Sequence, residues 1–216
     1  MTPSLLDRSP LVALVADKNI ELALNGLLSR HSSLGIRRVE AEIYVHPERD
    51  PGCLLRGHDF LRPFSTQYEY ALLMLDRQGC GRENETRSAL EEMTEQHLAR
   101  AGWGSRAVAI VLDPELEVWV WAGSPHVERV LGWHGRSPTL RTWLEEVGMM
   151  SDQRGKPIHP KRAVEEALRI VGKPRSSALY GDLARSVTLE SCTDPSFLKL
   201  RATLGEWFPQ VPREAT

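Results

Sequence analysis

The feature that most constrains the fold of this chain is a set of short apolar runs that end at acidic residues. The clearest run, Tyr70 to Leu75, stops at Asp76 and is followed by a turn that contains Gly79 and Gly81. Six consecutive residues with little charge are typical of a strand buried on both faces, as in a parallel sheet covered by helices. The glycines permit a tight turn directly after the strand. The run therefore predicts a central strand of such a sheet.

Three further segments extend this pattern. Leu11 to Ala16 is apolar and stops at Asp17, and Ala107 to Leu112 is apolar and stops at Asp113. Between them, Arg37 to Val45 alternates in the manner of a strand at or near a sheet edge. The chain thus contains three apolar strands and one alternating strand.

Helical patterns separate these strands. Apolar residues at helical spacing predict one helix from about Lys18 to about His31, and a second helix that Gly102 terminates. The segment from His46 to about Thr66 contains several prolines and glycines, and we expect it to be an irregular, functional loop. The succession of elements predicts an α/β fold with a mostly parallel, Rossmann-like sheet and helices on both faces.

The second half of the chain is expected to be helical. Its predicted helices mostly begin at or near a proline, where the missing N–H costs least: Pro125 to Leu131, Pro138 to Val147, Pro160 to Val171, Ser176 to Ser186 and Pro195 to Trp207. No polar linker separates the two halves. We therefore expect residues 1–122 to form the α/β core and residues 123–216 to form a helical extension packed on it, as one compact unit.

Composition limits the partners and the compartment. The net charge of −2 gives no overall attraction to nucleic acid or anionic membrane, so contact with either requires a local basic patch. No segment approaches a membrane span in length, and we expect no membrane association. The three cysteines are odd in number and far apart, which favours a reducing compartment over a disulfide framework. We therefore expect a cytoplasmic protein.

Acidic residues follow three of the predicted strands: Asp17, Glu21, Asp76, Asp113, Glu115 and Glu117. Carboxyl ends of parallel strands meet at one edge of a sheet, so these side chains can converge there. Mg²⁺ prefers oxygen ligands, and a bound metal stabilises the attacking and leaving oxygens of phosphoryl transfer. The alternative is that the acids only complement helix dipoles. Glu117 fits that alternative least, because it lies in an otherwise apolar run.

These motifs together resemble the TOPRIM family. They are an acid just after the first strand, an aspartate followed by a glycine turn after the third, and the sequence P-E-L-E-V-W at Pro114 to Trp119 after the fourth. Within this family, the chain resembles the compact TOPRIM-like proteins of bacterial anti-phage defence islands, including a component of a methylation-associated defence system. The sequence K-P-R-S-S-A-L at Lys173 to Leu179 resembles a basic Pro/Ser motif near the C-termini of such proteins.

The resemblance implies a TOPRIM-like fold with nuclease or nucleotidyl-transfer chemistry on DNA or RNA. It implies Mg²⁺ or Mn²⁺ as the cofactor and other defence-system subunits as partners. The matched acids are Glu21, Asp76 and Glu117, which are expected to hold the metal and to be catalytic.

Lys173, Arg175 and Ser176 are the candidate phosphate-binding residues. A serine that opens a helix presents backbone N–H groups beside two cations, and this combination can hold a phosphate. The alternative is a plain serine N-cap that follows a helix-stopping proline.

Two departures from the family pattern keep a second hypothesis open. The aspartate motif is normally D-x-D, whereas Arg77 and Gln78 follow Asp76 here. The first-strand acid normally lies beside a glycine, and neither Asp17 nor Glu21 does. The chain can therefore also be a non-catalytic adaptor that keeps the fold and binds a partner subunit.

Other features are weaker candidates. Metal-capable side chains lie at His46, Asp50, Cys53 and His58, but their spacing matches no zinc motif. The tryptophans of the second half are expected to pack in the core rather than to stack on bases.

Overall fold

A four-stranded parallel sheet lies at the centre of the part of the chain that the computed structural model describes, residues 8–150 and 155–210. Its strands are β1 (Ser9–Val15), β2 (Ala41–Val45), β3 (Tyr68–Asp76) and β4 (Ala107–Leu112). Their order is β2-β1-β3-β4, and every neighbouring pair is parallel. The predicted α/β class is confirmed, and the alternating strand β2 lies at an edge.

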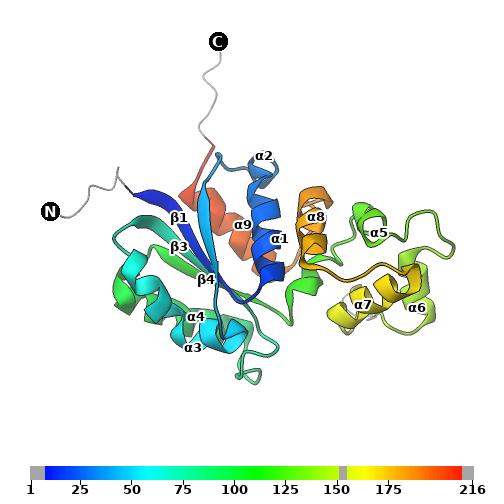
Figure 1. The fold of residues 1–216 in the computed structure, drawn as a ribbon, viewed down its shortest axis with the longest axis horizontal. Coiled ribbons are helices and arrows are strands. Elements are labelled where there is room, and N and C mark those ends of the chain that lie inside the picture. The colour runs from blue at the N-terminus through cyan, green and yellow to red at the C-terminus, as the bar shows by residue number, and fades with distance from the viewer. Residues whose placement is uncertain (1–7, 151–154, 211–216) are drawn as a thin grey trace, which may run out of the picture.

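Helices cover both faces of the sheet (Figure 1). In the first half they are α1 (Lys18–Leu28), α2 (His31–Leu34), α3 (Arg49–Leu61) and α4 (Arg87–Leu98), with the short turns η2 (Arg62–Phe64), η3 (Ala99–Trp103) and η4 (Leu116–Trp119). In the second half they are α5 (His126–Leu131), α6 (Leu140–Glu146), α7 (Pro160–Val171), α8 (Ser177–Ser186) and α9 (Pro195–Trp207). α1 and α9 lie on one face of the sheet, and α3 and α4 lie on the other. None of the described helices is long and apolar enough to cross a membrane.

The apolar runs form the centre of the core. Residues 11–16, 71–75 and 109–112 have no solvent-accessible surface. A strand buried on both faces carries apolar side chains at every position, so these runs lack the alternation that β2 shows.

The expectation of an irregular loop over residues 46–66 is wrong, because most of this segment forms α3. Pro51 lies in the first turn of α3, where a missing N–H removes no intrahelical hydrogen bond. Gly57 is a packing position, since a Cβ on it would lie 2.4 Å from Leu73 Cδ1. Residues that resembled loop punctuation therefore allow a helix to begin and to lie close against the sheet.

The second half of the chain is divided between two hydrophobic clusters. α9 joins the cluster around the sheet, whereas α5, α6 and α7 form a smaller cluster of their own. α8 joins both, since Tyr180 and Ala184 face the sheet cluster while Leu179 and Leu183 face the smaller one. α8 also packs closely on α1: a Cβ on Gly26 would lie 2.7 Å from the Cβ of Ala184. The helical half is thus attached to the core through α8 and α9, and α7 contacts η4.

Candidate functional site

A cleft of about 700 Å³ lies at the carboxyl edge of the sheet, where the neighbouring strands β1 and β3 end. Its acidic side is formed by Asp17, Asp50, Asp76 and Glu115, and its other side by the start of α7. Open α/β sheets bind their ligands at this edge. The cleft is therefore the candidate site, and it is built from both halves of the chain.

Asp76, the last residue of β3, lies in a chain of hydrogen bonds with Asp50 and Leu116. Its backbone N–H donates to Asp50 Oδ1 at 2.8 Å, and its own Oδ1 accepts the N–H of Leu116 at 2.9 Å. These contacts fix both carboxylates against the end of β3. The second oxygen of each carboxylate has no hydrogen-bond donor from another residue in the described part of the chain.

Asp17 and Glu115 are also held by backbone groups. Asp17 caps α1 by accepting the N–H of Ile20 at 2.9 Å. Glu115 accepts the N–H of Lys161 at 3.0 Å, which joins the segment after β4 to the first turn of α7. The position of α7 beside the sheet edge therefore depends on this cleft residue.

Burial and neighbouring acids raise the pKa values of Asp50, Asp76 and Glu115. Burial raises the pKa of Asp76 well above its ordinary value, and the charges of Asp50, Glu117, Asp17 and Glu115 raise it further. Burial is also the main cause of the raised pKa values of Asp50 and Glu115. Negative charge is thus concentrated here beyond what the neighbouring donors offset. A bound cation would relieve this repulsion.

The three acids predicted to hold a metal have different surroundings. Asp76 lines the cleft. Glu21 lies on α1 and pairs with Lys18 at 2.7 Å. Glu117 lies in η4, is 2% exposed, and accepts from Arg175 Nη2 at 2.9 Å. Two of the three carboxylates therefore already have cationic partners.

The predicted phosphate-binding residues lie outside the cleft, and two of them contact other parts of the protein. Arg175 is held by the carboxylates of Glu117 and Glu165. Lys173 donates to a backbone carbonyl of α5 at 2.6 Å. Ser176 is the N-cap residue of α8 and makes no side-chain cap hydrogen bond. The cleft at the sheet edge is lined by other residues.

The donor set of the cleft fits a hard cation better than a transition metal. The described residues contain no group of three or more His, Cys, Asp and Glu side chains arranged to hold a metal ion. Mg²⁺ usually takes only one or two protein carboxylates and keeps waters or substrate phosphates for its other positions. Asp50 and Asp76 supply two adjacent carboxylates of this kind. Within the trio Glu21, Asp76 and Glu117, Glu21 pairs with Lys18 and Glu117 pairs with Arg175, whereas Asp76 lines the cleft.

Sequence reasoning missed Asp50 and Lys161 as residues of the cleft. The sequence indicates Asp50 only as a metal-capable residue of a predicted loop, and the start of α3 after β2 brings it to the sheet edge. The proline that opens α7 predicted the helix start beside Lys161, but nothing in the sequence indicates which part of the core this start contacts.

The cysteines do not supply a nucleophile. All three, Cys53, Cys80 and Cys192, are free and buried. Burial raises the pKa of each thiol, so the reactive thiolate form is disfavoured.

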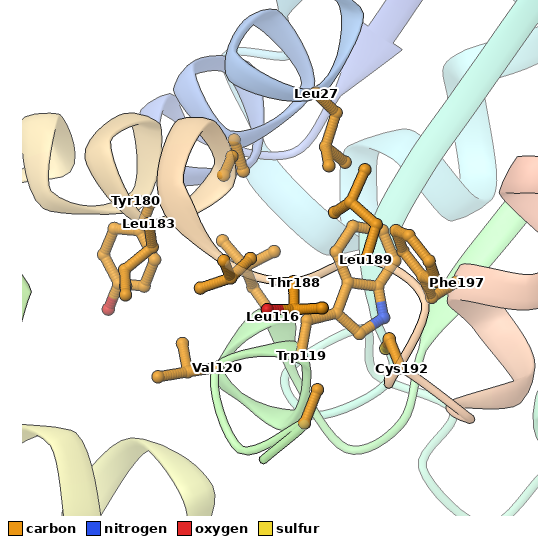
Figure 2. A pocket seen from close by; sticks show the side chains of 14 residues that line it. Leu27, Leu116, Trp119, Val120, Tyr180, Leu183, Thr188, Leu189, Cys192 and Phe197 are labelled. Atoms are coloured by element: carbon orange, nitrogen blue, oxygen red, sulfur yellow. The ribbon is translucent and has the colours of Figure 1, made fainter. Parts of the chain in front are cut away.

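A second cavity, between α1, η4 and α8, is apolar (Figure 2). Its volume is about 40 Å³, and Leu27, Leu116, Trp119 and Phe197 are among its walls. The walls are almost entirely apolar, so they offer a water or a polar ligand few hydrogen-bond partners. It is a packing gap rather than a ligand site, and the tryptophan beside it belongs to the core.

The fold and the cleft define a class: an α/β protein whose parallel sheet carries an acidic cleft at its carboxyl edge, completed by a helical second half. Comparison of the chain with protein-family models, with curated proteins and with solved structures found no match in any of the three.

Proposed function

We propose that this chain is a Mg²⁺-dependent phosphodiester enzyme, a TOPRIM-like nuclease of a multi-protein bacterial anti-phage defence system. The observation that carries the chemistry is the pair of adjacent carboxylates of Asp50 and Asp76 at the carboxyl edge of a parallel sheet, neither of which joins an ion pair with another described residue. The resemblance of the sequence to TOPRIM-like proteins supports the substrate and the biological setting. The free, buried cysteines are consistent with action in the cytoplasm.

In this proposal Asp50 and Asp76 hold the cation, and the other members of the matched trio do not. Mg²⁺ or Mn²⁺ in the cleft supplies stabilisation of charge on a transferred phosphoryl group. Glu115 keeps α7 beside the cleft through the N–H of Lys161. Glu117 acts outside the metal site, as the buried partner of Arg175.

The test is a titration of the purified protein with Mg²⁺ and Mn²⁺, in which the melting temperature is measured at each metal concentration. A ligand that binds only the folded state stabilises it by about 2.7 kcal/mol at a hundredfold excess over its Kd. We expect this stabilisation to be lost in Asp76→Asn and in Asp50→Asn. Glu21→Gln is the matched control, since it removes one negative charge nearby from a carboxylate paired with Lys18. An equal loss in Glu21→Gln, or no response in the unsubstituted protein, would contradict the proposal.

The alternative, a non-catalytic adaptor, is favoured by one observation. Glu117 and Arg175, both matched by the family resemblance, are bound to each other. An adaptor would capture a partner subunit equally well with and without Asp76→Asn and would show no stabilisation by divalent cations. Metal-dependent cleavage of DNA or RNA by the isolated chain, lost on Asp76→Asn, would exclude it.

A further inference from the structure

We propose that Arg49, Lys161 and Arg162 form a phosphate-binding side of the cleft, and that its ligand is a single-stranded nucleic acid or a nucleoside phosphate rather than a duplex. The inference rests on the proposed function and names the substrate class of the same site. It also makes the helical half, through α7, a part of the binding site rather than an appendage.

The three cations line the cleft together with its acids. Arg49 is the first residue of α3, and Lys161 and Arg162 lie in the first turn of α7. Lys161 is fixed there by its backbone N–H, which donates to Glu115 Oε1 at 3.0 Å. Its ammonium lies 4.0 Å from Glu115 Oε2, at the limit of an ion pair, and its side chain is 45% exposed. Lys161 is therefore anchored by its backbone while its charge faces the cleft.

The two arginines are available to a ligand. Both are exposed, and within residues 8–150 and 155–210 neither guanidinium donates a hydrogen bond or joins an ion pair. Arg77 and Arg87, by contrast, are each held by a carboxylate. A planar guanidinium without a carboxylate partner is suited to the bidentate recognition of phosphate.

The backbone of Arg49 makes its presence more informative. Its φ is 52°, a backbone conformation that residues other than glycine rarely adopt. Glycine takes this conformation without steric strain, so the arginine is present at a cost of about 1 kcal/mol. The local backbone favours glycine here, so the presence of arginine points to a role for its side chain.

The size and charge of the cleft indicate the ligand. A volume of about 700 Å³ lies in the range of small-molecule sites and admits a nucleotide-sized group. A duplex is too wide to enter such a space. The acids beside the arginines repel a phosphate until a cation neutralises them, so we expect binding to require Mg²⁺.

The experiment measures binding of a short, fluorescently labelled single-stranded oligonucleotide by anisotropy, in Mg²⁺ and in EDTA. We expect Arg49→Gln and Arg162→Gln each to weaken binding about tenfold, as for loss of a hydrogen bond from a charged donor. Each should also lower the slope of log Kd against log salt concentration by about 0.7, the value for one lost phosphate contact on a single strand. Arg38→Gln, an exposed arginine outside the cleft, is the control and should change neither quantity.

The outcomes separate this inference from the proposed function. Stabilisation by Mg²⁺ should survive in both arginine variants, because Asp50 and Asp76 are intact. If Mg²⁺ stabilises the protein but both arginine variants bind the strand as well as Arg38→Gln does, the inference is overturned and the proposed function stands. Strand binding that depends on the arginines but not on Mg²⁺, in a protein that Mg²⁺ does not stabilise, would support the phosphate-binding side and overturn both the metal site and the expected Mg²⁺ requirement.

Two further arms test the ligand class. A nucleoside monophosphate that displaces the labelled strand supports a nucleotide-sized site, whereas a duplex that binds as tightly as the single strand overturns it. Absence of strand binding by the unsubstituted protein in Mg²⁺ also overturns the inference.

Discussion

Asp76 and Glu117 are two acids that follow neighbouring strands, and the family resemblance assigns both to one metal site. The structure gives them opposite surroundings. Glu117 is buried and accepts hydrogen bonds from Arg175 and from the hydroxyl of Tyr180. Within residues 8–150 and 155–210, Asp76 accepts only a backbone N–H, and the charges that shift its pKa are those of other acids.

The contrast teaches how to separate a structural acid from a functional one. Burial, followed by the Glu117 charge, raises the pKa of the Tyr180 hydroxyl, so Tyr180 remains a donor to this carboxylate at neutral pH. Glu117 is thus a satisfied member of the interior. The charged form of Asp76 is disfavoured by burial and by the charges of the neighbouring acids, and a carboxyl with such a raised pKa in a cleft is a candidate functional residue.

The largest expected effect is the loss of stability in Glu117→Gln. Removing one member of a buried ion pair leaves its partner without a counter-charge, which typically costs 3–5 kcal/mol. Arg175 is 32% exposed and keeps Glu165, so we expect the lower end, about 3 kcal/mol, measured by urea unfolding.

Glu165→Gln is the matched control for this prediction. It removes the second carboxylate from the same arginine, but Glu165 is 46% exposed, so we expect a loss of at most about 1 kcal/mol. Equal losses of unfolding free energy in the two variants would contradict the distinction between Glu117 and Asp76, because burial of Glu117 would then contribute nothing to stability.

In the absence of divalent cations, we expect Asp76→Asn to increase the stability of the protein, whereas Glu117→Gln decreases it. Asparagine keeps an oxygen to accept the N–H of Leu116 and removes the repelled charge. We expect the melting temperature in EDTA to rise by about 2–4 °C, the change that corresponds to about 1 kcal/mol in a chain of this size.

Asp113→Asn is the control for this prediction, because Asp113 is 39% exposed and pairs with Arg77 at 2.9 Å. It should leave the melting temperature unchanged or slightly lower. A fall in Asp76→Asn would mean that Asp76, like Glu117, is a stabilising acid.

Much of the fold is predictable from the sequence because its signals are local. The prolines and apolar periodicity of the second half predicted α7 and α9 at the bounds that the structure shows. The acid-terminated apolar runs predicted the buried strands, and alternation predicted the edge strand β2. Each of these signals depends on neighbours within one turn of helix or a few residues of strand.

The site is less predictable because its contacts are distant in sequence. Arg175 and Glu117 are 58 residues apart, and Asp50 and Asp76 are 26 apart. Which acid receives a cationic partner depends on how α8 packs on α1 and on where α3 begins. Composition and spacing place several acids at one sheet edge, but they do not show which of these acids remain unpaired.

The smallest expected effect is a pH dependence of the advantage of Asp76→Asn, by which we mean its higher melting temperature relative to the unsubstituted protein. The pKa of Asp76 in the folded protein is raised above its unfolded value of about 3.9. Above that pH the folded state therefore retains a proton that the unfolded state has lost. Stability of the unsubstituted protein therefore falls through this window, whereas asparagine does not titrate. The advantage of Asp76→Asn should be near zero at about pH 4 and reach its full size toward neutral pH, as measured by melting temperature in EDTA.

The charged groups that act on Asp76 remain in both proteins, so the difference between the two proteins reports mainly the Asp76 charge. They are Asp50 in α3, Glu117 in η4, and Asp17 and Glu115, the N-cap residues of α1 and η4. Lys161 lies beyond Glu115 and is also common to both. An advantage that stays constant with pH would show that asparagine acts through packing or hydrogen bonding instead of charge. Such a result would remove the electrostatic distinction between Asp76 and Glu117, and with it the reason to place the cation beside Asp76.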